Sequence, residues 1–441
     1  KENNDDIENE LIKNGFKQDP DVLDAWFSSA LWPLSVMGWP NTNQSKEFDG
    51  LLQKHLPTDV LCTGRDIITL WVSRMVMFTR FFMNGKLPFK HVYINPMIQD
   101  GFGQRMSKSL GNGVDPRDII SGHGADSMRF VLCQIATSTQ DVRLSVDVKC
   151  PHTNKLFTPK TFKTSSGHEV PLPIQESPDS SGRQMVTAYG ILSGKAKETK
   201  DTPLAINSSS RFDIGRAFSN KVFNAVQFCL KRITNPDNEI CYENLELPDK
   251  WILHKLYEST KEINVALSNY QFSHASELLY DLWWRDICDW YLESIKHSIK
   301  YSSNSQAVLC ITLDISLRLL HPICPHLTES LWQILNNKFK VSADGISLSY
   351  SESLARSSYP EISKTYSSIN ALRDFNQLQQ IVIDIRRVRA NEKISPKLKL
   401  NVKANKSNTK FNTYIEHLAN VTIGDLFENE NNCHSLKLET N

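Results

Sequence analysis

The sequence predicts an α/β domain followed by an all-α domain, because the spacing of its apolar residues changes along the chain. In residues 16–144, aromatic and aliphatic clusters alternate with Gly, Pro and Asp, as expected of strands and helices separated by turns. In residues 212–335, apolar residues recur at three- and four-residue steps, which is the period of one helix face. Several such stripes in succession indicate an antiparallel helical bundle.

The length also predicts more than one domain. A chain of 441 residues, 40% of them apolar, can bury about two or three cores. We expect the α/β domain to span residues 1–145, the helical domain 211–362, and a helical and basic extension 363–441. Residues 146–210 are rich in Ser, Thr, Pro, Lys and Gly, so they are predicted to be a polar insertion or a linker.

Charge and cysteine content bear on the class of protein. With 50 Lys and Arg against 49 Asp and Glu, the net charge is +1, so a polyanion would have to bind to local basic patches. The nine cysteines include no Cys-x-x-Cys pair, which fits a reducing compartment rather than a disulfide framework. No apolar run is long enough to span a membrane. We expect a cytoplasmic monomer without a membrane partner, and an organellar form stays open.

The sharpest chemical signal is a glycine-bearing loop that follows an apolar, strand-like run at residues 92–98. Asp115 followed by Pro116 predicts the start of the next helix. The loop offers two cations and two hydroxyls, and these candidate catalytic residues are Arg105, Lys108, Ser107 and Ser109. Such groups neutralise phosphate oxygens that gain charge during displacement, and Lys108 is the strongest candidate. By itself, this loop is better interpreted as a solvated turn or a phosphorylation site.

Several segments of the chain carry a family resemblance. Residues 104–112 resemble the KMSKS signature of the class I aminoacyl-tRNA synthetases, with Arg105 at the position of the first Lys. Residues 19–33 and 38–40 resemble the valine-specific members of this family. Further family segments are resembled, in the same order along the chain, by residues 63–68, 71–75 and 124–130, and residues 289–293 and 320–332 resemble the anticodon-binding domain. The resemblance implies the C-terminal half of a Rossmann-like catalytic domain, followed by an antiparallel helical-bundle anticodon-binding domain.

The resemblance also assigns residues to the substrates. The amino-acid pocket would be walled by Trp26, Ile67 and Trp71, and the adenylate ribose would be held by Gly64 and Asp66. Two indoles and a β-branched side chain would form a narrow apolar slot for valine, and a carboxylate can accept both ribose hydroxyl hydrogens. The alternative is that both tryptophans are core residues, as buried indoles usually are.

The implied reaction has two steps. The carboxylate of valine attacks the α-phosphate of ATP, which enters with Mg²⁺, and the terminal ribose hydroxyl of tRNA(Val) then displaces AMP. Met106 and Lys108 would contact the ATP. The 441 residues contain no His-x-Gly-His segment and no counterpart of the family's editing domain. We therefore expect a C-terminal part of a synthetase that is inactive by itself.

Basic residues of the helical regions are the candidate tRNA contacts. They are Arg211, Arg216 and Lys221 at the first bundle helix, and Arg386, Arg387 and Arg389 in the extension. A solvated helix face is an equally good interpretation of each basic run.

Two alternative functions and the question of a metal site stay open at this point. Isoleucine specificity is the rival within the enzyme class, and a non-catalytic tRNA-binding protein derived from a synthetase is the rival of another class. Retention of Lys108 and Asp66 favours the enzyme. Cys150, His152 and His168 invite a metal hypothesis but fall short of a four-ligand set, so no metal site is expected.

Overall fold

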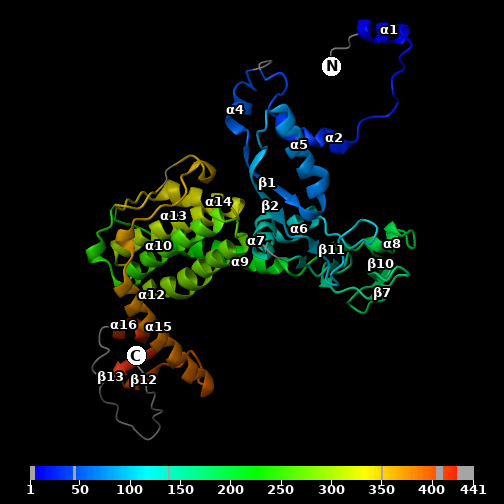
Figure 1. The fold of residues 1–441 in the computed structure, drawn as a ribbon. Helices are drawn as coiled ribbons and strands as arrows, with labels where there is room; N and C mark the ends of the chain where they lie inside the picture. The colour runs from blue at the N-terminus through cyan, green and yellow to red at the C-terminus, as the bar shows by residue number, and fades with distance from the viewer. Residues whose placement is uncertain are drawn as a thin grey trace. The chain divides into compact units, whose positions relative to one another are not determined.

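The computed structural model describes residues 5–42, 46–137, 140–237, 239–348, 351–403 and 411–424. The chain divides into two compact units, Lys1–Met97 and Ile98–Asn441. The predicted fold class, α/β followed by all-α, is confirmed by the arrangement of the elements (Figure 1).

The first unit is built on two parallel strands, β1 (Thr58–Gly64) and β2 (Phe89–Asn95). Thr58 lies opposite Phe89 and Gly64 lies opposite Asn95. Parallel strands need a crossover, which here consists of the 3-10 helix η1 (Arg65–Ile67), the π-helix η2 (Ile68–Val72) and α5 (Ser73–Phe82). Their core contains Leu61, Val72, Met75 and Phe89.

In the described residues before β1, the helices are α1 (Asp5–Lys13), α2 (Ala25–Ala30), α3 (Trp32–Ser35) and α4 (Leu51–His55). The carboxylate of Asp24 caps α2 by accepting a hydrogen bond from the backbone N–H of Trp26 at 2.9 Å. Helix α2 contacts both α5 and η2. Leu34, Met37 and Leu56 form a second small core.

The second unit opens with β3 (Ile98–Gln99), which pairs in parallel with β4 (Val142–Arg143). Between them lie α6 (Pro116–His123) and α7 (Ala125–Ile135). Asp115 caps α6 by accepting from the backbone N–H of Arg117 at 2.8 Å, and Pro116 occupies the first turn. The helix start predicted at this dipeptide is therefore confirmed.

Residues 146–210 are folded as short paired strands rather than as an extended linker. The elements are β5 (Asp147–Lys149), β6 (Leu156–Phe157), β7 (Thr161–Lys163), β8 (Glu169–Pro171), β9 (Ile174–Glu176), β10 (Gln184–Val186), α8 (Ala188–Leu192) and β11 (Ile206–Ser208). Strand β5 lies between β11 and β6, and both pairings are antiparallel. A core of Val148, Cys150, Met185 and Ala205 explains why so polar a segment folds. We call residues 146–210 the insertion module.

The helical part that follows is a bundle around one large core (Figure 1). Its elements are α9 (Phe212–Leu230), η3 (Tyr242–Asn244), α10 (Leu247–Ser268), α11 (Phe272–Asp281), the π-helix η4 (Leu282–Tyr291), α12 (Leu292–Ile295), α13 (Ser303–Leu320) and α14 (Pro325–Lys338). Helix α10 packs against α11 and α13, and α13 packs against α14 across the short connection 321–324. Trp251, Trp283 and Trp332 are fully buried in this core.

The 3-10 helix η5 (Leu354–Arg356) precedes the C-terminal extension. In the described residues of the extension, the elements are η6 (Lys364–Tyr366), the long helix α15 (Ile369–Asn391), β12 (Leu400–Lys403), α16 (Asn412–Ala419) and β13 (Val421–Gly424). Helix α15 is longer than the stretch 378–389 on which the sequence shows it best, and β12 pairs in parallel with β13. Within the part of the chain described above, no helix is long and apolar enough to cross a membrane.

Candidate functional site

We call residues 100–115, between β3 and α6, the signature loop. Two buried polar side chains near its two ends are hydrogen-bonded to each other. Asp100 and Asn112 are 3% and 4% exposed, and the Asn112 amide donates to the Asp100 carboxylate at 2.8 Å. The same carboxylate accepts from the backbone N–H groups of Phe102 and Gln104 at 3.0 and 2.9 Å. Buried polar groups that are all bonded hold one geometry, so the two ends of the loop are tied together.

Asn112 also sets the position of the signature residues. Its side-chain oxygen accepts from the backbone N–H of Ser107 at 2.9 Å, and its amide donates to the carbonyl of Arg105 at 3.3 Å. The hydroxyls of Ser107 and Ser109 lie 3.2 Å apart, and Ser107 also accepts from the backbone N–H of Leu110 at 3.3 Å. The two hydroxyls predicted to contact phosphate are therefore side by side.

The basic and apolar residues of the loop differ in their surroundings. Lys108 is exposed, and its ammonium makes no hydrogen bond or ion pair with any residue that the structure describes. Arg105 is exposed as well. Met106 is half-buried and packs against the small core around Ile119 and Val131. An exposed cation on a tied loop is suited to meet an anionic ligand, and Met106 anchors the loop beside it.

The residues predicted to bind valine lie on contacting elements of the first unit. Trp26, Ile67 and Trp71 are all half-buried, and α2, which carries Trp26, contacts η2, which carries Trp71. The indole N–H of Trp71 donates to the carbonyl of Ser29 at 3.3 Å, and the Ser29 hydroxyl donates to the carbonyl of Trp26 at 3.2 Å. These side chains are thus neither fully exposed nor sealed in the core as the bundle tryptophans are. Ile67 ends the 3-10 helix η1, and Trp71 lies in the π-helix η2 that follows it directly.

Gly64 and Asp66 form a close pair at the end of β1. A Cβ atom on Gly64 would lie 2.7 Å from Oδ1 of Asp66, so any side chain at position 64 would displace that carboxylate. Asp66 is exposed. The glycine at the strand end therefore leaves room for the carboxylate to fold back toward the backbone, at the edge where α/β proteins bind ligands.

The basic residues at the first bundle helix are partly committed to internal contacts. Arg216 is exposed and has no partner among the described residues. Arg211 donates to the carbonyl of Arg143 at 3.3 Å. Lys221 pairs with Asp289 at 2.9 Å and lies 3.6 Å from the ring centroid of Trp284. Arg216 is thus the most available of the three for an external phosphate.

The basic residues of α15 do not form one uniform patch. Arg386 donates to the carbonyl of Leu418 at 2.9 Å and stacks over Trp290, and Arg387 pairs with Asp384 at 2.8 Å. Arg389 is only 5% exposed, and it donates to three backbone carbonyls, those of Ser395, Leu398 and Asn420. Arg389 therefore fastens the segment after α15, and its burial argues against the predicted contact with tRNA.

The insertion module gives its cysteine and histidines separate partners. The Cys150 thiol lies 3.4 Å from the Ser177 hydroxyl, and His152 bonds to the carbonyl of Gln184 at 2.9 Å. His168 lies 3.0 Å from the hydroxyl of Ser166. Among the residues with described positions, no group of three or more His, Cys, Asp or Glu is arranged to hold a metal ion.

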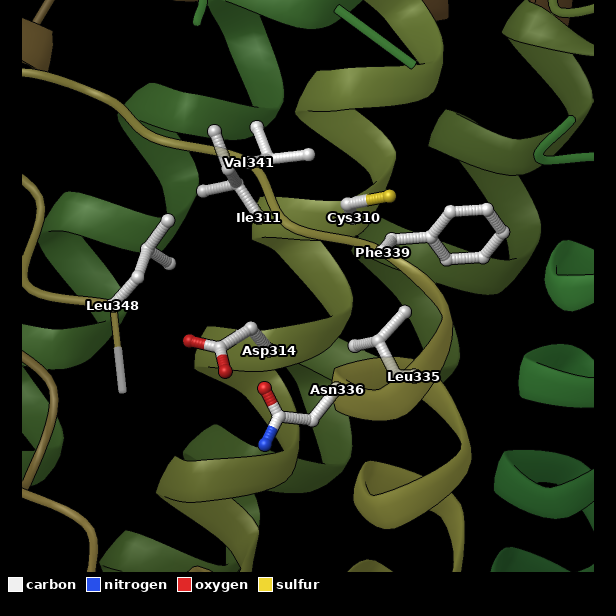
Figure 2. Close-up of a pocket in the computed structure, with 8 residues that line it drawn as sticks. All are labelled: Cys310, Ile311, Asp314, Leu335, Asn336, Phe339, Val341 and Leu348. Atoms are coloured by element: carbon white, nitrogen blue, oxygen red, sulfur yellow. The ribbon is translucent and has the colours of Figure 1, made fainter. Parts of the chain in front are cut away.

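A small cavity in the described part of the bundle is too small for a substrate. Figure 2 shows its lining, which includes Cys310, Asp314 and Asn336, and its volume is about 20 Å³. This is room for about one water molecule. Both carboxylate oxygens of Asp314 already have partners, because Oδ1 accepts from the Trp332 indole at 2.7 Å and Oδ2 accepts from Arg318. The cavity is a packing defect beside a buried ion pair.

Sequence reasoning missed the residues that support the signature loop. Asp100, Asn112 and Gln104 lie within or beside the signature, and their buried bonds were not anticipated. The only sequence signal was a set of short polar side chains on either side of the signature, which is typical of any loop. Asn207, whose amide donates to the carbonyls of Gly111 and Gly113, lies far along the chain, so its role could not be predicted from spacing.

Comparisons with known proteins match this organisation. A family model described as tRNA synthetases class I (I, L, M and V) matches residues 1–145, and one described as anticodon-binding domain of tRNA ligase matches residues 249–404. The chain belongs to the class I aminoacyl-tRNA synthetases. Similar proteins include a valine--tRNA ligase of Rhodopirellula baltica, 38% identical over 397 residues, and one of Fervidobacterium nodosum, 36% identical over 410 residues.

The synthetase chain covers only part of these relatives. The alignments include 89% and 92% of this chain but 36% and 38% of the relatives' own length. A solved structure of LeuRS from Agrobacterium radiobacter K84, in a ternary complex with tRNA and LeuAMS, covers 80% of this chain and 34% of its own, with a TM-score of 0.50 and 18% identity. At that identity the likeness concerns the fold alone.

Proposed function

We propose that this chain forms part of a valine–tRNA ligase, which activates valine with ATP and transfers it to tRNA(Val). The observation that carries the proposal is the exposed Lys108, presented on a loop whose two ends are tied by the buried Asp100 and Asn112. The specificity for valine is supported by similarity to proteins named valine--tRNA ligase along about nine tenths of the chain.

The chemistry would depend on position and charge rather than on a general base. The valine carboxylate attacks the α-phosphate of ATP, the bond to the β-phosphate oxygen breaks, and pyrophosphate leaves with its charge. Lys108 and Arg105 would neutralise that charge, and the paired hydroxyls of Ser107 and Ser109 would donate to phosphate oxygens. Mg²⁺ would enter as the counter-ion of ATP. A ribose hydroxyl of tRNA then attacks the adenylate carbonyl and AMP leaves.

The amino-acid specificity would come from the first unit. Trp26, Ile67 and Trp71 offer half-buried apolar surface for a β-branched side chain, and Asp66, which has space beside Gly64, would accept from the ribose hydroxyls. Met106 would line the ATP site beside Lys108. For tRNA we propose Arg216 first, then Arg211, Lys221, Arg386 and Arg387, and we leave Arg389 out because it is buried. Cytoplasmic residence, a monomeric state and the domain limits stay predictions.

Amino-acid-dependent exchange between ATP and pyrophosphate tests the proposal. The complete gene product that contains this chain should exchange fastest with valine, more slowly with threonine and isoleucine, and Lys108→Ala should abolish most of the exchange. Preference for isoleucine would support the rival enzyme. Absence of exchange together with retained tRNA binding would support a non-catalytic protein. The same assay on residues 1–441 alone tests the expectation that this chain is inactive by itself.

A further inference from the structure

We propose that the insertion module is a brace for the signature loop, and that Gln104 and Asn207 are positioning residues that hold the loop in a single conformation. The insertion module touches the signature loop through residues of β8, α8 and β11. What the brace does for catalysis rests on the proposed function, whereas the brace itself is a property of the fold.

The first contact joins the loop to β8 through a side-chain amide. The Gln104 amide N–H donates to the carbonyl of Glu169 at 2.8 Å, and its oxygen accepts from the backbone N–H of Glu169 at 2.7 Å. Gln104 also donates to Asp100 at 2.8 Å, so this side chain joins the module to the buried base of the loop. A paired amide contact of this kind fixes both distance and orientation.

The second contact comes from β11, on the other side of the signature. Asn207 is 8% exposed, and its amide donates to the carbonyls of both Gly111 and Gly113 at 2.8 Å. Asn207 lies opposite Val148 in the pairing of β11 with β5, so its backbone is held by the module's central strand. Two bonds from one rigidly held amide would keep the end of the signature from moving away.

The third contact is steric. Gly111 has φ +58, and a Cβ atom there would lie 2.5 Å from the backbone nitrogen of Tyr189 and 2.7 Å from its Cα atom. Tyr189 is in α8 and is 6% exposed. The backbone of the module therefore lies directly against the loop, where only glycine fits. Both sides of the signature are held, while Lys108 between them stays exposed.

Limited trypsin digestion of the 441-residue chain tests the brace without any substrate, because trypsin cleaves after Arg105 and Lys108. Asn207→Asp keeps the size of the side chain but removes both donors. We expect cleavage after Lys108 to become about tenfold faster, since opening of the loop is governed by the bonds that it breaks. Gln104→Ala should have a similar effect. Cleavage after Lys200, an exposed site in the module, serves as the internal reference.

The matched control is Asn154→Asp, which makes the same chemical change in the same module at an exposed residue whose given hydrogen bond, to the Cys150 carbonyl, comes from its backbone N–H. It should leave cleavage after Lys108 at the parent rate. The brace is refuted if both Asn207→Asp and Gln104→Ala cleave after Lys108 at the parent rate, or if the rate rises only in step with cleavage after Lys200.

A kinetic measurement on the complete gene product then connects the brace to catalysis. Asn207→Asp should lower kcat of pyrophosphate exchange about tenfold and leave KM for valine unchanged, because the candidate valine residues lie in the first unit. A variant that merely lowered the folded fraction would lower the yield of active enzyme and leave kcat per active site unchanged. If the parent shows no exchange at all, the proposed function fails, while the digestion result still decides the brace.

Discussion

Lys108 of the signature loop and Arg318 of the helical bundle carry the same charge in opposite surroundings. Lys108 is exposed and has no partner among the residues that the structure describes. The Arg318 side chain is 1% exposed, bonds to Asp314 at 2.9 Å, and also donates to the carbonyls of Ser347 and Ser358. A buried cation must find partners in the fold, whereas an exposed one is available to a ligand. The neighbours of a charge therefore indicate its role better than its place in a basic run does.

The largest effect is expected where the buried pair is broken. Arg318→Ala would leave Asp314 buried without its cation, and burial already raises the pKa of this carboxyl. Removing one partner of a buried ion pair costs about 3–5 kcal/mol of the free energy of unfolding. Urea unfolding followed by helical circular dichroism measures the loss. Arg356→Ala removes an exposed ion pair with Glu352 and should cost less than about 1 kcal/mol. Equal losses in the two variants would contradict the comparison.

The exposed cation should show the reverse pattern. Lys108→Ala removes the cation that we propose contacts phosphate, and it should lower the rate of valine-dependent pyrophosphate exchange by about 10² to 10³ in the complete gene product. Its urea midpoint should match that of the parent, because no bond within the described residues is lost. Lys163→Ala, at an exposed lysine of the insertion module, is the control and should leave the exchange rate unchanged. A shift of the urea midpoint on Lys108→Ala would show that this lysine is structural.

The pH dependence of the free energy of unfolding offers a further test, because Asp249 is a buried carboxyl that accepts hydrogen bonds from two hydroxyls. Burial raises the pKa of Asp249 to about 6, although hydrogen bonds from Ser305 and Tyr291 at 2.6 and 2.8 Å oppose the rise. The folded state therefore keeps a proton near pH 5 that the unfolded state has released. The free energy of unfolding should fall as pH rises from about 4 to 6, by at most about 3 kcal/mol from this group.

Asp249→Asn tests this pH dependence because an amide does not titrate. The urea midpoint of the parent should fall between pH 4.5 and pH 6.5 relative to that of the variant. A constant difference between the two proteins across this range would show that Asp249 keeps an ordinary pKa in the fold.

The smallest effect concerns the basic residues proposed to meet tRNA. Arg216→Ala should weaken tRNA binding and reduce the slope of log affinity against log salt by about 0.7 to 0.9, the value for one phosphate contact. Arg389→Ala should instead lower the urea midpoint, because the hydrogen bonds that Arg389 donates to three backbone carbonyls are lost. Filter binding over a salt series separates the two, with Arg356→Ala as the control. If Arg216→Ala shows the same salt slope as the parent, Arg216 does not contact tRNA.

Sequence patterns predicted the structure correctly where that structure depends on residues close together in the chain. The start of α6 at Asp115 and Pro116 was predicted, because a capping side chain and a proline act within one turn. The bundle was predicted because apolar residues recur at three- and four-residue steps along α9, α11 and η4, whereas α13 is buried at every position from Ser305 to Leu320 and has no single apolar face. The sequence left residues 146–210 open between an insertion and a linker, because strands of two or three residues show no period and the core of the module has four members.

The roles of individual basic and polar residues were less predictable. Arg387 and Arg389 look alike in the sequence, yet one is exposed on α15 and the other is buried against backbone carbonyls. Asn207 reads as an ordinary residue of a polar segment, but it bonds to carbonyls nearly a hundred positions away. Such contacts depend on which segments the fold brings together, and spacing along the chain does not contain that information.

The sequence by itself determined the order of the two fold classes, the family resemblance, and the chemical groups of the signature loop. These depend on residue type and local spacing, which are written in the chain. Only the tertiary structure decided that Lys108 has no partner among the described residues and that Arg389 is buried. It also decided that Gln104 bonds the signature loop to Glu169, and that Asn207 bonds to Gly111 at the end of the signature. The physical reason is that the cost of burying a charge or an amide depends on its neighbours in space.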